Sequence, residues 1–552
     1  METIIYFNQQ QTILFAVEEL RRYLRKAGHL VQVYHASYKE KVIEGQNIIL
    51  MLEEEYRISP YFIEENPLQK DGFAIYEDKT NTYIIGKEAR SILYGIYYYC
   101  EKVLGYQWVT LIEEPPEKPQ RKPLIKSWDI HNPIFSRRGN IIETVNDPIY
   151  LHQLIDWGVK NRLNEFFFTF FLWDEVKASI KEALVQRGVH VTLGGHSLDF
   201  LLKGEDNEQP NFFAGNHQLQ HIVIQKIIDI CKETPIITRL SLWPEDIGIS
   251  EKEFADFLPT YVTFMERLKA ALKVNQLNVK VEHIVYNAGL SWNMLERKES
   301  TEASTDIDVL FAYWGRDYSR SIDSPSPQQK RAHHALVDWR KQTRQNHTSM
   351  TVLEYYSDSF MLSELFPPLL NRMQKDILDY KNEGVDGVLN LIVPYHAKRA
   401  NAEMKKKYPW KWINQLNNFF YAGLVWGRDY NELLEQFFAI FGENKDQYRS
   451  IVLELENIVA KHSKWNVPLF PARVVDPEKA QLPNSSEAII ILLEEILDFL
   501  NSQEANLDQE LLALQTTDNY HAFSSNEMLL IYFHYVKKVA HLCKQGWNLK
   551  IN

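Results

Sequence analysis

The sequence predicts an α/β protein in which a central (β/α)8 barrel (a TIM barrel) follows an N-terminal α+β domain and precedes a C-terminal helical domain. Between residues 126 and 404, short apolar segments alternate eight times with amphipathic segments of helical spacing. Before this region short strands alternate with helices, and after it only helical spacing recurs. Because 552 residues are too many for one hydrophobic core, we expect three domains, at 1–125, 126–404 and 405–552.

The first region is predicted to be an α+β domain. Segments 3–7, 30–34 and 47–52 are short and apolar, as strands are, whereas 13–26 and 91–104 show helical spacing. Two further strands, 72–76 and 83–86, flank the turn sequence Asp78-Lys79-Thr80-Asn81, which indicates a hairpin. The proline-rich segment 113–123 has the composition of a linker.

The second region is predicted to contain the barrel, and an open doubly wound sheet is the alternative. We expect its strands near 138–143, 165–172, 189–194, 238–243, 280–286, 308–313, 350–355 and 386–393. Helices are predicted between them at 150–161, 176–187, 219–232, 251–273, 328–344 and 369–382. The third region is predicted to be helical at 410–425, 430–441, 446–461, 486–501 and 527–544.

Charge and composition narrow the class of function. The formal net charge is −12, so most of the surface would repel a nucleic acid. No apolar stretch approaches the roughly 20 residues that cross a bilayer, and the N-terminus has no recognisable signal peptide. The three cysteines, Cys100, Cys231 and Cys543, are too far apart for a zinc site or a disulfide framework. We therefore expect a cytoplasmic protein with reduced thiols, and neither a metal nor a cofactor.

One motif resembles the non-catalytic N-terminal domain of family 20 β-hexosaminidases and α-glucuronidases. In those enzymes it has the form G-R-S-x-x-G-x-x-Y-x-L-x-x-x-L-G-x-R-W and stands just before the barrel. Here Gly86-Lys87 precedes the helix that begins at Ser91, and Leu104-Gly-Tyr-Gln-Trp108 closes it, with Gln107 in place of the usual Arg. The resemblance implies a glycoside hydrolase with a catalytic barrel after this domain.

A second set of motifs resembles bacterial barrel proteins labelled DUF4838, part of which became the family 163 endo-β-N-acetylglucosaminidases. The motifs are Gly194-Gly-His-Ser197, Leu242-Trp-Pro-Glu-Asp246 and the segment 419–442. This resemblance implies hydrolysis of a glycosidic bond in an oligosaccharide, with β-N-acetylhexosaminidase-like chemistry.

The catalytic candidates are carboxylates at predicted strand ends, where barrel enzymes place their active sites. Glycosidic cleavage needs two carboxyl groups, one acting as the acid and the other as a nucleophile or base. Glu245 ends the predicted fourth strand and Glu354 the predicted seventh, and Asp246 could hold the acid role instead. A retaining enzyme would hold the pair about 5–5.5 Å apart. An ordinary solvated strand-end carboxylate is the simpler interpretation of each.

Aromatic and polar residues at the same strand ends are predicted to bind the sugar. They are His196, Trp243, Tyr286, Asn287, Trp314, Arg316, Tyr355, Tyr356, Tyr395 and His396. Arg316 would indicate an acidic sugar if it pointed into the site, because Arg binds carboxylates bidentately; an ion pair with a neighbour is the simpler explanation. Two alternatives stay open: an inverting α-glucuronidase-like hydrolase, and a carbohydrate-binding barrel without catalysis.

Overall fold

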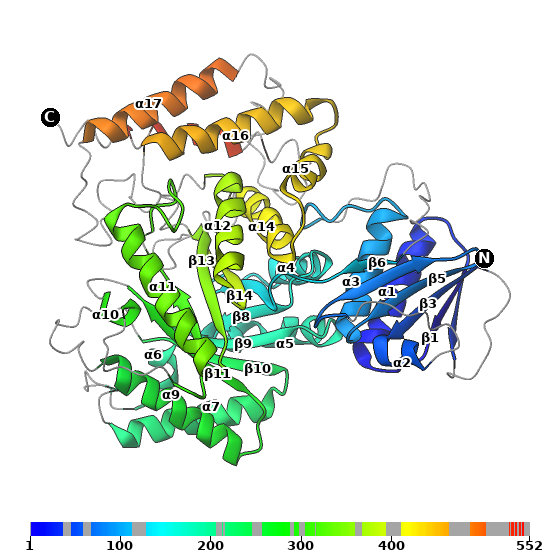
Figure 1. The fold of residues 1–552 in the computed structure, drawn as a ribbon, viewed down its shortest axis with the longest axis horizontal. Coiled ribbons are helices and arrows are strands. Elements are labelled where there is room, and N and C mark those ends of the chain that lie inside the picture. The colour runs from blue at the N-terminus through cyan, green and yellow to red at the C-terminus, as the bar shows by residue number, and fades with distance from the viewer. Residues whose placement is uncertain are drawn as a thin grey trace.

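The structure is a computed structural model in which an N-terminal sheet domain stands beside a barrel, and a group of C-terminal helices lies along the top of the view (Figure 1). It describes residues 2–36, 46–58, 68–112, 128–205, 212–213, 216–244, 257–287, 292–296, 304–314, 316–358, 367–393, 410–462, 486–503 and part of 529–545. The predicted linker at 113–123 and half of the predicted helix at 527–544 lie outside these residues.

The N-terminal domain is a six-stranded sheet in the order β2-β1-β3-β5-β4-β6. The predicted hairpin joins β4 and β5, and the Asp78 carboxylate accepts from the backbone N–H groups of Thr80 and Asn81 at its turn. The last strand, β6, lies beyond the expected boundary at 125. The elements are β1 (Glu2–Tyr6), α1 (Gln11–Lys26), β2 (Val31–His35), β3 (Gln46–Leu52), α2 (Glu53–Arg57), β4 (Phe73–Glu77), β5 (Asn81–Gly86), α3 (Ala89–Lys102) and β6 (Asp129–His131).

Eight parallel strands close the barrel in the order β10-β11-β12-β13-β14-β7-β8-β9, which confirms the predicted fold class. All eight lie where the sequence pattern predicts strands. They are β7 (Arg137–Ile142), β8 (Glu165–Thr169), β9 (His190–Gly195), β10 (Ile237–Leu242), β11 (Lys280–Tyr286), β12 (Asp308–Ala312), β13 (Met350–Asp358) and β14 (Gly387–Val393).

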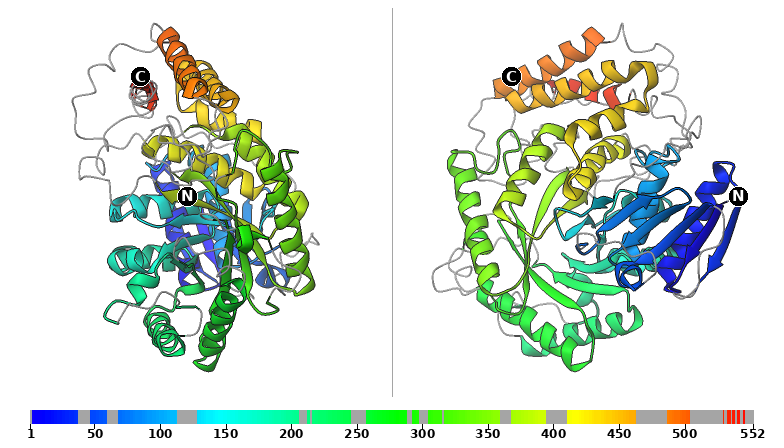
Figure 2. Two further views of the ribbon diagram at one scale, coloured as in Figure 1. Left: turned by 90° about the vertical axis from the view of Figure 1, so that its left-hand side faces the viewer. Right: turned by 45° about the vertical axis from the view of Figure 1, so that its right-hand side comes forward.

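Helices surround these strands (Figure 2). The predicted strand 165–172 is shorter than expected, because the Thr169 hydroxyl accepts from the Leu172 N–H and starts a helix there. The outer helices are α4 (Pro148–Lys160), α5 (Phe170–Gln186), α7 (His217–Glu233), α9 (Phe257–Val274), α11 (Pro327–Gln345), α12 (Leu370–Glu383) and α14 (Trp410–Trp426), with short helices α6 (Leu198–Leu201) and α10 (Trp292–Leu295) between strands and helices.

The expected boundary at 404 lies outside the described residues, which resume at 410. Helix α14 packs on β7, β13 and β14 and so completes the ring around the barrel. Buried asparagines fix it there: Asn418 of α14 exchanges hydrogen bonds with Asn140 of β7 and accepts from Asn390 of β14. The helices after it are α15 (Tyr430–Ala439), the 3₁₀ helix η1 (Gly442–Asn444), α16 (Lys445–His462) and α17 (Ser486–Gln503).

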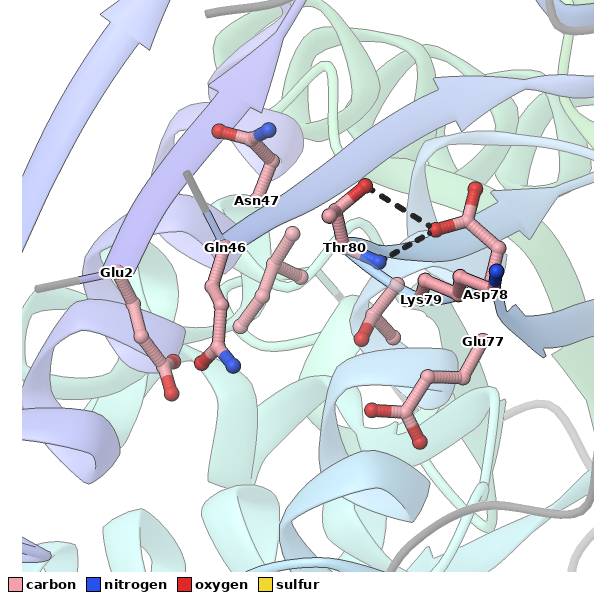
Figure 3. Close-up of a pocket in the computed structure, with 9 residues that line it drawn as sticks. Glu2, Gln46, Asn47, Glu77, Asp78, Lys79 and Thr80 are labelled. Atoms are coloured by element: carbon pink, nitrogen blue, oxygen red, sulfur yellow. Dashed lines mark hydrogen bonds between the residues drawn. The ribbon is translucent and has the colours of Figure 1, made fainter. Parts of the chain in front are cut away.

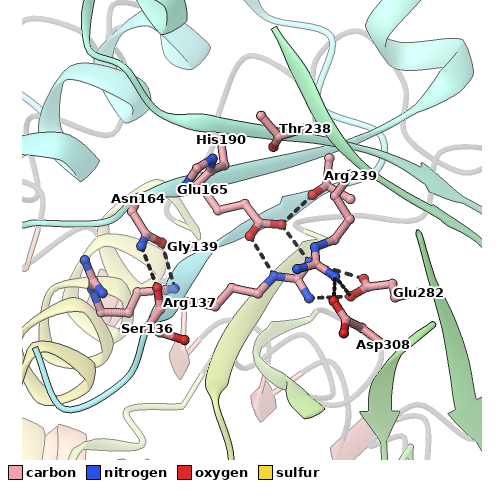
Figure 4. A network of polar contacts seen from close by, with 12 residues as sticks. Ser136, Arg137, Gly139, Asn164, Glu165, His190, Thr238, Arg239, Glu282 and Asp308 are labelled. Carbon is pink, nitrogen blue, oxygen red and sulfur yellow. Dashed lines mark hydrogen bonds and ion pairs between the residues drawn. The ribbon is translucent and has the colours of Figure 1, made fainter. Parts of the chain in front are cut away.

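An ionic network at the N-terminal end of the barrel shows which side chains face its interior (Figure 4). Arg137 of β7 pairs with Glu165 on the next strand at 2.6 Å and also with Glu282 of β11, four strands away in the barrel order. Arg239 bonds Asp308 at 2.6 Å in the same network. Only side chains that point into the lumen can meet across the barrel. Because successive strand residues alternate between faces, these contacts fix the inner face of every paired strand.

A second buried network fastens the N-terminal domain to the barrel. The Asp71 carboxylate accepts from Arg90 of its own domain at 2.9 Å, from Arg138 of β7 at 2.8 Å and from Asn164 at 2.6 Å. Burial would raise the pKa of Asp71, but the charges of Arg90 and Arg138 hold it well below its usual range. These bonds therefore hold the N-terminal domain against the barrel.

Candidate active site

The C-terminal mouth of the barrel carries a ring of inward-facing side chains. The alternation set by the lumen network continues along each strand, so every second residue from Arg137, Glu165, Thr192, Arg239 and Glu282 faces inward. At the ends of five neighbouring strands this inner series reaches Glu143, Thr169, His196, Trp243 and Tyr286. Active sites of TIM-barrel enzymes lie at this end.

His196, Trp243 and Tyr286 form one cluster on three adjacent strands. The ring of His196 meets the edge of Trp243 at a centroid distance of 5.3 Å and lies 6.2 Å from Tyr286. The Nδ1–H of His196 donates to the Pro244 carbonyl at 2.7 Å, and the Tyr286 hydroxyl donates to the same oxygen at 3.4 Å. Because a carbonyl can only accept, this bond assigns the proton to Nδ1 and makes Nε2 the acceptor in the neutral ring. The structure thus brings three predicted sugar-binding residues together.

Trp243 forms the floor of this cluster and is not an open platform. It is almost fully buried, packs against Phe167, and its indole N–H donates to the Ser241 hydroxyl at 3.0 Å. His196 is only half-buried. We therefore expect a ligand to contact the imidazole and the rim of the Trp243 ring.

Asn287, which follows Tyr286 at the end of β11, contacts Trp314 after the next strand, β12. The Asn287 amide donates from Nδ2 to the Trp314 carbonyl at 3.1 Å. Its Oδ1 is buried and accepts no hydrogen bond within the described residues. A buried acceptor of this kind is costly unless a donor reaches it.

Glu143 reaches over a glycine beside His196. A Cβ added to Gly195 would lie 4.0 Å from the Glu143 Oε1 and only 2.8 Å from the Thr169 methyl carbon. Gly195 also has a φ of +67°, which disfavours other residues. The Glu143 carboxylate therefore lies close to Gly195, the residue before His196. Glu143 directly follows the first barrel strand, and this strand-end position in the sequence could have identified it as a candidate site residue.

Glu354 lies on the opposite face of the sheet, away from the mouth at which the sequence predicts it as a catalytic carboxylate. Its register partner is Asn390, whose amide contacts Asn418 of the outer helix α14. The Glu354 carboxylate is buried between the barrel and α12, where it accepts from the Tyr318 hydroxyl at 2.5 Å and from Tyr380 of α12. Because side chains alternate between the two faces of a regular strand, the Glu354 side chain points away from the lumen.

Arg316 and Tyr356, which the sequence predicts as substrate-binding residues, belong to the same outer layer and not to the mouth. Arg316 pairs with Glu354 at 2.6 Å and with Asp376 of α12, so its charge is already matched. The Tyr356 hydroxyl donates to Asp376 at 3.2 Å. Burial has the largest effect on the pKa of Glu354 and, together with the charge of Asp376, raises it although Arg316 acts in the opposite direction.

A β-bulge in β13 brings a different carboxylate to the mouth. Between Glu354 and Ser357 the strand has one residue more than β14, and Tyr355 and Tyr356 occupy this bulge. Tyr355 is buried, and its backbone N–H donates to the Tyr318 hydroxyl. After the bulge, Ser357 accepts from Asn390 on the outer side, and the next residue, Asp358, turns inward. Sequence reasoning missed Asp358 because a bulge leaves no mark in the apolar pattern.

Four predicted site residues lie outside the described residues: Glu245, Asp246, Tyr395 and His396. In the described ranges, no cluster of three or more His, Cys, Asp or Glu side chains is arranged to hold a metal ion. A separate polar pocket lies on the N-terminal domain near the β4–β5 turn (Figure 3). Its lining includes Glu2, Gln46 and Asp78 but no aromatic ring.

Comparison with known proteins agrees with this architecture. Residues 1–99 match the family described as Glycosyl hydrolase family 67 N-terminus. Among curated proteins, no relative matches the sequence. Among the helices described, none is both long and apolar enough to cross a membrane.

Solved glycoside hydrolases share the fold at low sequence identity. A GH138 enzyme targeting pectin rhamnogalacturonan II has a TM-score of 0.61 and 12% identity, over 99% of this chain and 70% of its own. A GH115 4-O-methyl-α-glucuronidase with specificity for decorated arabinogalactans has a TM-score of 0.61 and 11% identity, over 99% and 72%. The GH20 β-N-acetylhexosaminidase from Streptomyces coelicolor A3(2) has a TM-score of 0.50 and 12% identity, over 83% and 92%. The chain therefore has the domain arrangement and barrel fold of glycoside hydrolases, and the resemblance to family 163 stays a prediction.

Proposed function

We propose that this protein is a glycoside hydrolase that cleaves an oligosaccharide at the C-terminal mouth of the barrel. The observation that carries the proposal is the inner-face ring at the strand ends, which combines aromatic rings, an imidazole and carboxylates. Rings pack against the apolar faces of sugars, and the polar groups bond their hydroxyls. The match of residues 1–99 to a glycosyl hydrolase N-terminus supports the same class.

The reacting sugar is proposed to be neutral. A uronic acid needs a cationic partner, and Arg316, the sequence-based candidate, is buried against Glu354 and Asp376 on the outer face. At the strand ends, the described inner-face residues include no lysine or arginine. A β-N-acetylhexosaminide fits this lining better than a glucuronide. Its acetamide group is neutral and can be bound by hydrogen bonds and apolar contacts, without a cationic side chain.

The proposed mechanism is retaining and uses two carboxyl groups. Glu245 or Asp246 would donate a proton to the leaving oxygen as the glycosidic bond breaks, while a carboxylate at the far side of the mouth attacks the anomeric carbon. Water would then attack the same carbon, give its proton to the first group and release the second. His196 and Glu143 are proposed to hold the sugar hydroxyls. Following the anomer of the first product by NMR separates this route from the inverting alternative.

The test is a hydrolysis screen of chromogenic β-N-acetylglucosaminide, β-N-acetylgalactosaminide, β-glucoside, β-galactoside and α-glucuronide, with calorimetry of the corresponding free sugars. His196→Ala is run beside the wild type, and His334→Gln, an exposed position on α11, is the matched control. Release from a neutral glycoside that is weakened only in His196→Ala supports the proposal. Binding without release would indicate a carbohydrate-binding protein without catalysis, and neither binding nor release would contradict the proposed site.

A further inference from the structure

We propose that Asp358 is the catalytic carboxylate that carries negative charge beneath the reacting sugar, an inference that rests on the proposed function. The β13 strand contains two acidic residues, Glu354 and Asp358, separated by four positions. In a regular strand, residues four apart face the same side. Both would then point outward, and the seventh strand would offer the lumen no carboxylate.

The bulge between Glu354 and Ser357 changes this direction. Glu354 pairs with Asn390, and Ser357 pairs with Ile392, so three steps on β13 match two steps on β14. The one extra residue reverses the alternation for the rest of the strand. Both Glu354 and Ser357 are tied to the outer face, Glu354 through Tyr380 and Ser357 through Asn390. Asp358, the residue after Ser357, therefore faces the lumen.

The register of the next strands places Asp358 at the level of the mouth. Asp358 pairs with Val393 of β14, and Ile392 before it pairs with Ile142 of β7. Val393 is thus level with Glu143, and the three inner-face residues form one row on neighbouring strands. With strands about 4.8 Å apart, Asp358 and Glu143 begin roughly 10 Å from each other and converge toward the axis. A sugar ring fits between two such carboxylates.

Asp358 is well placed for an anionic role and Glu143 for binding. The side chain of Asp358 is short and only 3% exposed, so it can lie under a bound sugar but cannot reach far into solvent. Glu143 is longer, half-buried and extends toward Gly195. The ends of β10 and β13 lie three strands apart in the barrel order. Positive charge that develops at the anomeric carbon would be stabilised by the Asp358 carboxylate.

The experiment uses iminosugars, whose protonated nitrogen mimics that charge. Calorimetry compares wild type, Asp358→Asn and Ser357→Ala with gluco, galacto and 2-acetamido iminosugars and with neutral methyl glycosides of the same configuration. Asp358→Asn should weaken the best iminosugar about 10- to 100-fold, the size of a lost charge-assisted hydrogen bond, and leave the neutral glycoside within about threefold. Ser357→Ala, which alters the outward neighbour, should change neither affinity. Denaturant unfolding of each variant confirms that it is folded.

The outcomes separate this inference from the proposed function. Equal iminosugar affinities in wild type and Asp358→Asn would overturn the role of Asp358 while leaving a sugar site at the mouth. Loss of iminosugar and neutral glycoside together would make Asp358 structural and would also overturn it. If no sugar of either kind binds the wild type, the mouth is not a carbohydrate site and the proposed function fails. Where hydrolysis is measurable, Asp358→Asn should lower kcat about 10²- to 10³-fold with little change in KM.

Discussion

The guanidinium of Arg316 lies 2.6 Å from the carboxylate of Glu354, and both side chains are buried between the barrel and α12. Arg316 also pairs with Asp376, and Arg372 reaches Asp376 at 3.1 Å. The layer therefore holds two cations and two carboxylates, with the hydroxyls of three tyrosines around them: Tyr318, Tyr356 and Tyr380. Such a network fastens α12 and the loop after β12 to the strand that carries Asp358.

Replacing Glu354 by Gln should act on stability and leave the chemistry largely intact. The variant leaves Arg316 without one of its two anionic partners, and breaking a buried ion pair costs about 3–5 kcal/mol. Denaturant unfolding measures this loss, with the exposed Asp323→Asn of the same loop as control. Turnover per folded molecule should stay within a few fold of wild type. Unchanged stability with a loss of turnover by orders of magnitude would instead restore the prediction that Glu354 is catalytic.

This relationship also shows how far sequence reasoning extends. The eight strands could be predicted because each is an apolar run bounded by polar turns, and the inner residues His196, Trp243 and Tyr286 follow from strand ends alone. Glu354 could not be placed, since its direction depends on the lumen network and on the register of β13 with β14. The bulge turns Asp358 toward the lumen while Glu354 points outward. It depends on the pairing of two strands, so the sequence of one strand does not reveal it.

A substitution at Gly195 tests whether a ligand binds beside Glu143. Gly195→Ala forces a side chain onto a residue with φ of +67° and brings its Cβ to 2.8 Å from the Thr169 methyl carbon. We expect about 1–2 kcal/mol of lost stability from the left-handed backbone alone. Gly28→Ala, at φ +87° with open space around it, should show a comparable backbone cost. Only Gly195→Ala should also weaken sugar binding in calorimetry, and equal binding in both variants would argue against a ligand beside Glu143.

The pH dependence of stability should reflect Glu456 of α16. Its carboxylate accepts from the backbone N–H groups of Asn371 and Arg372 at the start of α12, both at 3.2 Å, and burial raises the pKa of Glu456 to about 7. The folded state then binds the proton more tightly than the unfolded state, so this contribution to stability is complete below about pH 4.5 and is lost as the pH rises through 7.

Glu456→Gln should therefore reduce the fall in stability between pH 5 and pH 8. The difference from wild type is expected to be on the order of 3 kcal/mol at most, at 1.36 kcal/mol for each pKa unit. Thermal unfolding at several pH values measures it, and Glu454→Gln on the same helix is the matched control. Parallel curves for wild type and Glu456→Gln would show that this carboxylate does not titrate with folding.

His283 should make the barrel sensitive to acid. It lies on the outer face of β11, fully buried between the rings of Tyr261 and Trp339. Burial lowers the pKa of His283 to about 4. The unfolded state then binds the proton more tightly, so stability is complete above about pH 6.5 and falls as the pH drops through 4.

His283→Leu removes both the buried nitrogens and the titration, so it should match or exceed the stability of wild type at pH 7. At pH 5 its advantage should grow by about 2 kcal/mol, since 1.5 pKa units at 1.36 kcal/mol each separate this pH from 6.5. Urea unfolding at both pH values measures the difference, with His334→Gln at an exposed position of α11 as control. A constant offset between His283→Leu and wild type at the two pH values would mean that His283 takes up no proton on unfolding. Its pKa would then not be lowered in the folded state.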